Sequence, residues 1–320
     1  MKAIVVNEYG GPEVLRIEQR PDPVAGPGEI VVRLHAAGVN PVETYQRAGS
    51  QGYQGTLPFT PGADGAGAVE AIGADVIGFA PGDRVYVSGS ITGTYASRCL
   101  CSADQVNHLP ESLSYEEGAC LWINYGTAYR ALFQRGGARA GERVLIHGAT
   151  GGVGIAAVQW ARYAGLEVMG TYGSAAGEQL LAAAGVEKRF NHHEDGYLES
   201  VASAAGDGID LVVEMLANVN LEADLDLLGR GGRVVIVGSR GAIEITPRKL
   251  MGREADVRGL MLAGSTPGER REIHASIAAA AGRAGSIRPV IQRSFPLAQA
   301  AEAHRAVMED PSHGKIVLVP

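Results

Sequence analysis

The stretch Arg143–Gly165, "RVLIHGATGGVGIAAVQWARYAG", decides the fold of this chain. It begins with an apolar run typical of a buried strand, passes through four glycines in seven residues and continues with apolar residues at helical spacing. Gly151 allows the backbone to approach a pyrophosphate, and Gly154 allows helix and strand to pack closely. Because a helix N-terminus also presents unpaired N–H groups, the turn predicts a dinucleotide-binding site made by consecutive residues: Thr150, Gly151, Gly152, Val153 and Gly154.

The residues after this turn support the interpretation. Helical patterns alternate with short apolar runs at 167–172, 188–191, 209–216, 233–239 and 257–262, which with the run before the turn makes six expected strands. Strands that alternate with helices of this length imply a doubly wound, parallel α/β sheet of the Rossmann type. The alternative is a glycine-rich turn that only packs tightly. It is disfavoured because four glycines weaken folding unless something must approach the backbone.

The first 120 residues follow a different pattern. Short β-rich runs such as "KAIVV" and "EIVVRLHAAG" are separated by turn signals, among them Pro27-Gly28, Pro61-Gly62 and Pro81-Gly82. They predict an irregular, partly antiparallel β-barrel. The residues from about 265 onward predict an alanine-rich helix, a strand, a second helix and a terminal strand.

Composition excludes several classes of protein. The formal net charge of −7 offers no general attraction for nucleic acid or an anionic membrane. No apolar run approaches the roughly 18 residues of a membrane span, and the N-terminus lacks the features of a signal peptide. Three cysteines in 320 residues argue for a reducing compartment, and the expected location is the cytoplasm.

The segment Val168–Gly177, "VMGTYGSAAG", indicates which dinucleotide is bound. An NAD site places an acidic residue about 20 residues after the glycine turn, whereas this chain has none there. A carboxylate would repel a 2′-phosphate, so its absence favours NADPH. The predicted phosphate-binding residues are Gly173, Ser174 and His192; a helix cap for Ser174 and a solvated loop for His192 are the open alternatives. No arginine or lysine lies in the loop 173–177, although Lys188 or Arg189 could contribute from the next strand.

Several motifs together resemble a known family. "GGPEVL", "GVNPVETYQRAG", "PFTPGADGAG", "GTAYRAL" and "GATGGVG" resemble the zinc-free medium-chain dehydrogenase/reductases, and "EMLANVNL", "VGSRG" and "HGKIVLVP" resemble their quinone oxidoreductases of the zeta-crystallin type. The resemblance implies a GroES-like catalytic domain from residues 1–122 and 265–320. It also implies an NADP-binding Rossmann domain at 123–264, with NADPH in the cleft.

The resemblance also implies roles for individual residues. Asn40 and Tyr45 are expected to line the nicotinamide end. Tyr125 and Thr127 are expected to face the cleft, where Tyr125 could stack on a quinone or donate a hydrogen bond to it; a core or hinge position is the alternative. The remaining expected cofactor contacts are Asn220, Val237, Gly238, Ser239, Arg240, Leu260, Met261 and Leu262, with a helix cap as the alternative for Asn220.

The sequence predicts that no metal is bound. The position of the family's Gly-His-Glu motif reads Gly62-Ala63-Asp64, without a histidine. Cys99, Cys101 and Cys120 cannot form a four-cysteine site. Cys99 and Cys101 are expected on alternate sides of a strand, with one thiol buried.

These observations predict an NADPH-dependent quinone oxidoreductase that works without a metal. A quinone or an enone accepts hydride at carbon and spreads the charge over a conjugated oxygen, so it needs no strong Lewis acid. An NADPH-dependent enone or enoyl reductase is the alternative, and a non-catalytic structural or RNA-binding role is one of another class. The expected partners are a small-molecule quinone or enone and, through the unprotected edge strand 257–262, a second copy of the chain in a homodimer or homotetramer.

Overall fold

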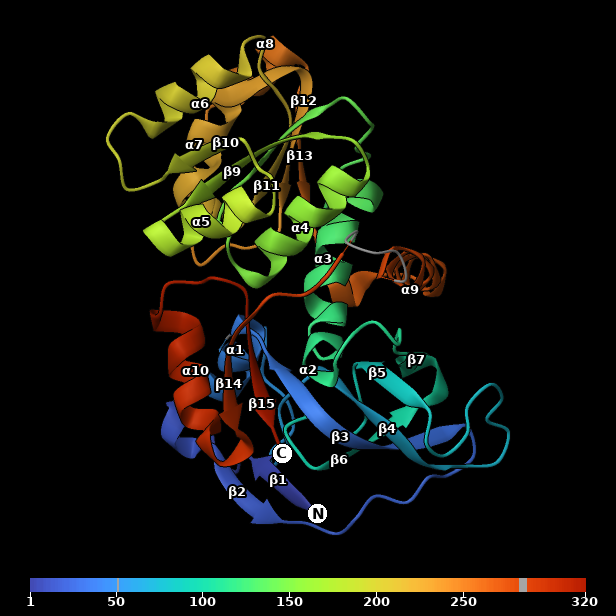
Figure 1. Cartoon of the computed structure of the whole chain (residues 1–320). Helices are drawn as coiled ribbons and strands as arrows, with labels where there is room; N and C mark the ends of the chain where they lie inside the picture. The colour runs from blue at the N-terminus through green and yellow to red at the C-terminus, as the bar shows by residue number, and fades with distance from the viewer. Residues whose placement is uncertain (51, 282–286) are drawn as a thin grey trace. The chain divides into compact units, whose positions relative to one another are not determined.

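The computed structural model describes residues 1–50, 52–281 and 287–320. Contacts divide the chain into two units, Met1–Ile123 with Arg288–Pro320, and Asn124–Ile287 (Figure 1). The expected C-terminal part of the first domain began at 265. The structure instead groups the described residues 265–281 with the second unit, while residues 282–286 of that expected part lie outside the described residues.

The second unit contains the predicted parallel sheet. In the described residues its strand order is β10-β9-β8-β11-β12-β13, and every neighbouring pair is parallel. The chain starts at β8 in the middle, runs outward to β10, and then returns to β11 and runs outward the other way. This reversal is the topological switch point of a doubly wound fold. The strands are β8 (Arg143–Ile146), β9 (Glu167–Tyr172), β10 (Lys188–Asn191), β11 (Ile209–Glu214), β12 (Leu228–Ile236) and β13 (Asp256–Gly259).

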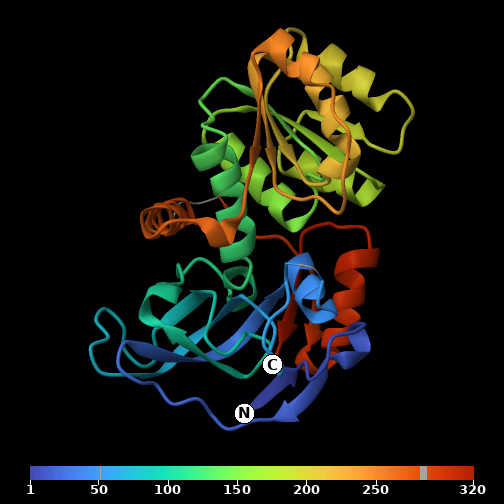
Figure 2. The ribbon, with the colours of Figure 1, turned by 180° about the vertical axis from the view of Figure 1, so that it is seen from behind.

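Helices cover this sheet on both faces (Figures 1 and 2). On one face Leu145, Met169 and Val212 of the sheet pack against α6 and α7 and are fully buried. Each such side chain contributes about 1.5–3 kcal/mol to folding, so the apolar runs predicted from the sequence become the core. The α-helices of the second unit are α3 (Thr127–Tyr129), α4 (Gly152–Tyr163), α5 (Ala175–Ala183), α6 (Tyr197–Ala205), α7 (Ala217–Leu227), α8 (Pro247–Arg253) and α9 (Pro267–Ala281), with a π-helical turn at Arg130–Arg135. Another π-helical turn, Leu121–Gly126, begins in the first unit and ends in the second.

The first unit is built from both ends of the chain. Its described strands form a sheet in the order β14-β15-β3-β4-β5-β7, with β6 also paired to β3, and a separate antiparallel pair β1-β2. All its pairs are antiparallel except β14 with β15, as the barrel prediction expected. The strands are β1 (Lys2–Val5), β2 (Arg16–Gln19), β3 (Glu29–Val39), β4 (Asp64–Ile72), β5 (Arg84–Ser88), β6 (Arg98–Ser102), β7 (Val106–His108), β14 (Ile291–Pro296) and β15 (Lys315–Val319).

Short helices complete the first unit, and both termini lie in it (Figure 2). The α-helices are α1 (Pro41–Ala48), α2 (Tyr115–Gly118) and α10 (Ala300–Glu309). Single 3₁₀ turns occur at Pro12–Val14, Ala103–Gln105, Leu262–Gly264 and Leu297–Gln299, the third of them in the second unit. In the parts of the chain that the structure describes, every helix falls short of the length and apolarity that a membrane span requires.

The expectation for the two cysteines of β6 was wrong. Cys99 and Cys101 are both fully buried, and their Sγ atoms are 3.6 Å apart. Residues i and i+2 of a strand point to the same face, so the two thiols share one side of β6 rather than alternate. All three cysteines are buried and free.

Candidate functional site

The predicted binding residues of the Rossmann sheet lie where its strands end. Parallel strands have their carboxyl ends at one edge, so residues that follow different strands meet there. The glycine turn follows β8, at the switch point of the strand order. The other predicted segments are 173–174 after β9, residue 192 after β10, 220 near the start of α7, 237–240 after β12 and 260–262 after β13.

The glycine turn has the geometry of an anion-binding helix start. Gly151 is the N-cap of α4, so the first N–H groups of this helix have no partner within it. A Cβ on Gly154 would lie 2.1 Å from the carbonyl oxygen of Gly148, closer than any real contact. Gly148 has a φ of +56°, which glycine adopts without strain. Both glycines are therefore required by the backbone, and the turn can approach a ligand closely.

The end of β9 forms a small polar corner. Ser174 is the N-cap of α5, and its Oγ accepts a hydrogen bond from the N–H of Gly177 (3.2 Å), so the cap role left open by the sequence is present. The ring of His192 lies beside Gly173, where an added Cβ would be 2.8 Å from its Cε1. The ring of His193 lies tilted beside that of His192, with the ring centres 4.3 Å apart. Burial lowers the pKa of His192, and the neighbouring His193 lowers it further.

The cations of β10 are engaged away from this corner. Lys188 donates through Nζ to the carbonyl oxygen of Ala204 (2.9 Å). Arg189 donates through Nη1 to the carbonyl oxygen of Val186 (2.6 Å), and its Nη2 lies 3.9 Å from Oε1 of Glu178. Ser174, His192 and backbone N–H groups therefore carry the polar chemistry of the corner.

The loops after β11 and β12 are hydrogen-bonded to each other. The N–H of Val237 donates to the carbonyl oxygen of Glu214 (2.8 Å), and the N–H of Ala217 donates to that of Gly238 (2.9 Å). A Cβ on Gly238 would lie 2.4 Å from the carbonyl oxygen of Met215, so this approach requires glycine. These hydrogen bonds hold the loop after β11, which leads into α7 and its predicted cofactor contact, next to the loop after β12, which contains further predicted contacts.

Asn220 is not the helix cap that the sequence left open. Helix α7 begins at Ala217, so Asn220 lies in its first turn. Its Nδ2 donates to both carboxylate oxygens of Glu214, each at 3.2 Å. Sequence analysis did not single out Glu214, nor His147 and Asp224 beside it. The signal for His147 and Glu214 was a charged or polar residue at the end of an apolar strand run, whereas Asp224 lies within α7 and had no such signal.

The remaining residues predicted after β12 and β13 differ in exposure. Ser239 and Arg240 are exposed, and the N–H of Arg240 donates to Oδ1 of Asn218 (2.8 Å). Met261 is 61% exposed, whereas its neighbours Leu260 and Leu262 are buried. Met261 is therefore the side chain of this segment that a ligand could reach without repacking.

Tyr125 and Thr127 lie inside the second unit. Tyr125 is 1% exposed, and its hydroxyl donates to Oε1 of Gln159 (2.7 Å). Its carbonyl oxygen accepts from the indole N–H of Trp160 (3.1 Å). Thr127 is also buried. These contacts favour the core position that the sequence left open for Tyr125.

Asn40 belongs to a buried polar network in the first unit. It precedes α1, and its Nδ2 donates to Glu43 (3.0 Å) and to Asp64 (3.1 Å). Its Oδ1 accepts from Nζ of Lys315, which also lies 3.4 Å from Asp64. Burial raises the pKa of Glu43 and of Asp64, and Lys315 opposes the rise. Tyr45, on α1, is half-buried beside the ring of Tyr53.

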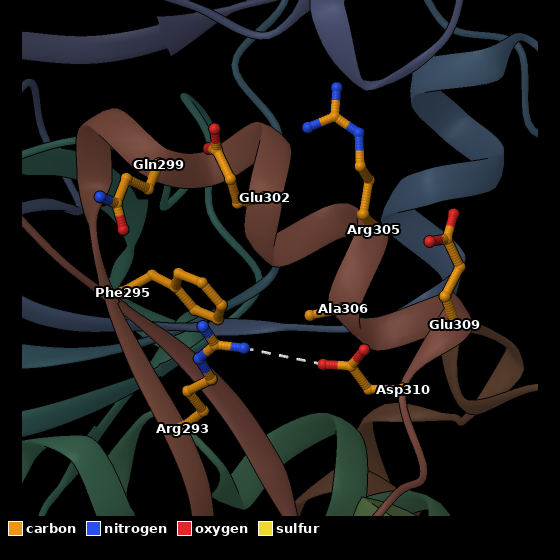
Figure 3. Close-up of a pocket in the computed structure, with 8 residues that line it drawn as sticks. All are labelled: Arg293, Phe295, Gln299, Glu302, Arg305, Ala306, Glu309 and Asp310. Carbon is orange, nitrogen blue, oxygen red and sulfur yellow. Dashed lines mark ion pairs between the residues drawn. The ribbon is translucent and has the colours of Figure 1, made fainter.

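A groove in the first unit lies between β14 and α10 (Figure 3). Its volume is about 430 Å³, and the guanidinium of Arg293 lies 4.4 Å from the centre of the Phe295 ring. Arg293 also pairs with Asp310 at 3.7 Å. The groove contains none of the predicted site residues. Both signs of charge line it: Arg293, Glu302, Arg305, Glu309 and Asp310.

Known proteins with similar sequences and structures have the same two kinds of domain. Residues 26–130 match the alcohol dehydrogenase GroES-like domain, and residues 152–279 match the zinc-binding dehydrogenase family. The human quinone oxidoreductase is 44% identical, over 100% of this chain and 98% of its own. The Escherichia coli quinone oxidoreductase complexed with NADPH has a TM-score of 0.90 at 29% identity, and an NAD-dependent alcohol dehydrogenase has 0.92 at 29%; each match covers both chains completely.

The family matched by residues 152–279 is described as zinc-binding, but the residues of this chain do not suit a catalytic zinc ion. Where the zinc-dependent relatives' histidine was expected, the chain has Ala63, and the adjacent Asp64 is already paired with the cation of Lys315. A second cation there would be repelled, so the donor set does not fit a catalytic zinc. His147, Glu214 and Asp224 have ligand atoms within 4.8 Å of one another. Two of these atoms already serve each other rather than a metal, because the imidazole of His147 is hydrogen-bonded to Asp224 at 2.8 Å.

Proposed function

The chain belongs to the quinone oxidoreductases of the zeta-crystallin type, within the medium-chain dehydrogenase/reductases, and from this membership we propose that its second unit binds NADPH for the reduction of a quinone. The Rossmann sheet with its glycine turn is an NAD(P)-binding fold. Membership makes the protein a quinone oxidoreductase; the choice of NADPH over NADH is the part that is proposed.

One observation carries the choice of NADPH. The second strand of the Rossmann unit ends at Tyr172 and is followed by Gly173, without the carboxylate that would accept from a ribose 2′-hydroxyl. The imidazole of His192 lies against Gly173 instead. An imidazole can donate to a phosphate and can carry a positive charge, whereas a carboxylate would repel it. The corner therefore favours a 2′-phosphate.

The chain's residues bind and orient the cofactor and substrate. The N–H groups at the start of α4 would bind the pyrophosphate, and the glycines would allow it to approach. When bound, NADPH supplies a hydride, which with one proton converts a quinone to a hydroquinone. The roles expected for Asn40, Tyr45, Tyr125 and Thr127 stay predictions. Of these, Tyr45 is the least buried, since the other three are at most 7% exposed.

Fluorescence titration and a substrate screen test the proposal. We expect the Kd for NADPH to be at least about tenfold below that for NADH, because a charge-assisted contact contributes about 1.5–3 kcal/mol. NADPH oxidation should be fast with ortho- or para-quinones and slow with enals and enoyl thioesters. Tighter binding of NADH would contradict the phosphate corner, and turnover of enoyl thioesters alone would favour the enoyl reductase alternative. Gly151→Val, which crowds the glycine turn, is the inactive control.

We also propose that the chain forms a homodimer or homotetramer in the cytoplasm. Strand β13 is at the edge of the described sheet, with β12 as its neighbour, and edges of this kind pair with other strands. Part of the edge is covered, because Nε of Arg135 donates to the carbonyl oxygen of Gly259 (3.1 Å). The buried, free cysteines support a reducing compartment. Light scattering of the purified protein should give the mass of two or four chains, and a monomer would overturn the assembly.

A further inference from the structure

Glu214 ends β11 as a fully buried acid on which several donors converge. The N–H of Leu216 donates to its Oε1, and Nδ2 of Asn220 donates to both oxygens at 3.2 Å. Leu216 is the N-cap of α7, and Asn220 lies in the first turn of this helix. The carboxylate therefore holds together the turn that carries a predicted cofactor contact.

Two further buried residues, His147 and Asp224, lie beside Glu214. Nε2 of His147 lies 3.6 Å from Oε2 of Glu214 and 2.8 Å from Oδ1 of Asp224. His147 directly precedes Gly148, the first residue of the glycine turn, and Asp224 lies on α7. Burial raises the pKa of Glu214 to about 7, so above about pH 8 the group is mostly ionised and both of its oxygens only accept hydrogen bonds. The cluster is a fixed support that joins the end of β8, the end of β11 and α7.

This support determines how the amide of Asn220 is oriented. Carboxylate oxygens accept hydrogen bonds, so the NH₂ end of the amide faces Glu214 and the carbonyl end, Oδ1, faces away. Asn220 is half-buried, and in the described part of the chain its Oδ1 accepts no hydrogen bond. Asn220 thus offers a single acceptor to a ligand at the carboxyl edge of the sheet.

We propose that Glu214 is a positioning residue that fixes the amide of Asn220, so that Oδ1 accepts a hydrogen bond from a donor on the bound dinucleotide. The donor is a ribose hydroxyl, the amino group of the adenine or the carboxamide N–H of the nicotinamide, since the phosphates of a dinucleotide have only acceptors. The proposal rests on the NADPH site proposed above. Glu214 itself touches neither cofactor nor substrate; it acts through Asn220.

A double-mutant cycle on the Kd for NADPH tests this, at about pH 8.5, where Glu214 is mostly ionised. Glu214→Gln keeps the size of the side chain but adds a donor, so it no longer selects one orientation of the Asn220 amide. We expect Glu214→Gln and Asn220→Ala each to weaken NADPH binding about three- to tenfold, the effect of one hydrogen bond. The double variant should bind no more weakly than Asn220→Ala. Glu199→Gln, at an exposed position of α6, is the matched control and should bind as the wild type does.

The cycle also separates the possible failures. If Glu214→Gln weakens binding equally with and without Asn220, or not at all, Glu214 does not act through Asn220 and the proposal is overturned while the NADPH site stands. If the wild type does not bind NADPH, both are overturned.

Should Glu214→Gln fail to fold, Asn220→Asp at the half-buried position replaces it. This variant keeps an acceptor but has no donor for Glu214, so binding as tight as in the wild type would overturn the proposal. Its added charge repels NADPH more than NADH, so the proposal is supported if Asn220→Asp weakens both cofactors by the same factor as Asn220→Ala does, and overturned if only NADPH is weakened.

Two cofactor analogues identify the donor. The 3-acetylpyridine analogue of NADPH has a methyl ketone in place of the carboxamide, so it lacks the N–H. If the carboxamide is the donor, Asn220→Ala should leave the Kd of this analogue unchanged. If a ribose hydroxyl or the adenine amino group is the donor, Asn220→Ala should weaken the analogue as much as it weakens NADPH. Either pattern supports an acceptor at Asn220, and an unchanged Kd for both cofactors would overturn it.

Discussion

Replacement of Gly154 by alanine tests the link between the glycine turn and the cofactor. A Cβ at this position would lie 2.1 Å from the carbonyl oxygen of Gly148 and 2.7 Å from Cα of Ala149. Both are backbone atoms, so no side chain can rotate away. Ordinary contact begins at 3.4 Å, so the turn has to move by more than about 1 Å.

The size of the effect follows from two opposing contributions. Alanine in a helix interior is normally more stable than glycine by about 0.5–1 kcal/mol. Overpacking costs about 1–3 kcal/mol, and the rigid neighbours place Gly154→Ala at the upper end of that range. The expected net loss is about 2 kcal/mol, or a fall in Tm of about 4–8 °C for a unit of this size. Because Gly148 and Ala149 belong to the turn, NADPH binding should weaken at least about tenfold.

The assay is thermal unfolding together with NADPH titration, and α8 provides the control. Gly252 lies in a helix of the same unit, and a Cβ there meets nothing within 4 Å. Gly252→Ala should therefore keep or slightly raise the Tm and leave the Kd for NADPH unchanged. If Gly154→Ala behaved like Gly252→Ala in both measurements, the close approach of helix and turn would not matter, and the reasoning would be refuted.

The remaining predictions concern charge, metal and thiols. Because burial lowers the pKa of His192 below its usual value of 6.5 and protonation favours a phosphate, the preference for NADPH over NADH should change little from pH 8 to 6.5 and grow as pH falls below 6.5; His192→Ala should flatten this trend in titrations at each pH. Elemental analysis should find no stoichiometric zinc, and a chelator should leave quinone reduction unchanged; a full equivalent of zinc would contradict the fit at Asp64. Lys315→Met leaves buried Asp64 without its cation and should cost about 3–5 kcal/mol in denaturant unfolding, whereas Arg288→Ala removes an exposed partner and should cost about 0–1 kcal/mol. The hydrogen bond with Cys101, and then burial, raises the pKa of Cys99, and burial raises that of Cys120. A thiol reagent at pH 8 should therefore label no cysteine before denaturant is added; rapid labelling of the native protein would show that the thiols are accessible.

The local pattern of the sequence was sufficient to predict the Rossmann sheet. The strand, glycine turn and helix of Arg143–Gly165 occur as expected, and the six expected strands form one parallel sheet. Period and turn residues are properties of neighbouring positions, so they can be read along the chain. The error at Cys99 and Cys101 came from applying that period wrongly, since positions two apart share a face of a strand.

The sequence also indicated where ligands collect, but not how side chains there are engaged. Ser174 and Asn220 both follow strands of the sheet, yet one caps a helix and the other is held by a buried acid. The burial of Tyr125 against Gln159 was equally open from the sequence. In each case the partner is determined by packing between elements rather than by the residue's neighbours in the chain.

By itself, the sequence determined the α/β class, the order of strands and helices, and the position of the glycine turn, because each depends on residues within one or two turns of one another. Only the tertiary structure decided that His147, Glu214 and Asp224 meet behind that turn, and that Lys315 near the C-terminus neutralises Asp64. These partners are separated by 10 to 251 residues. A buried charge requires a partner, but its position along the chain does not say which one; the sheet and helices bring that partner into reach.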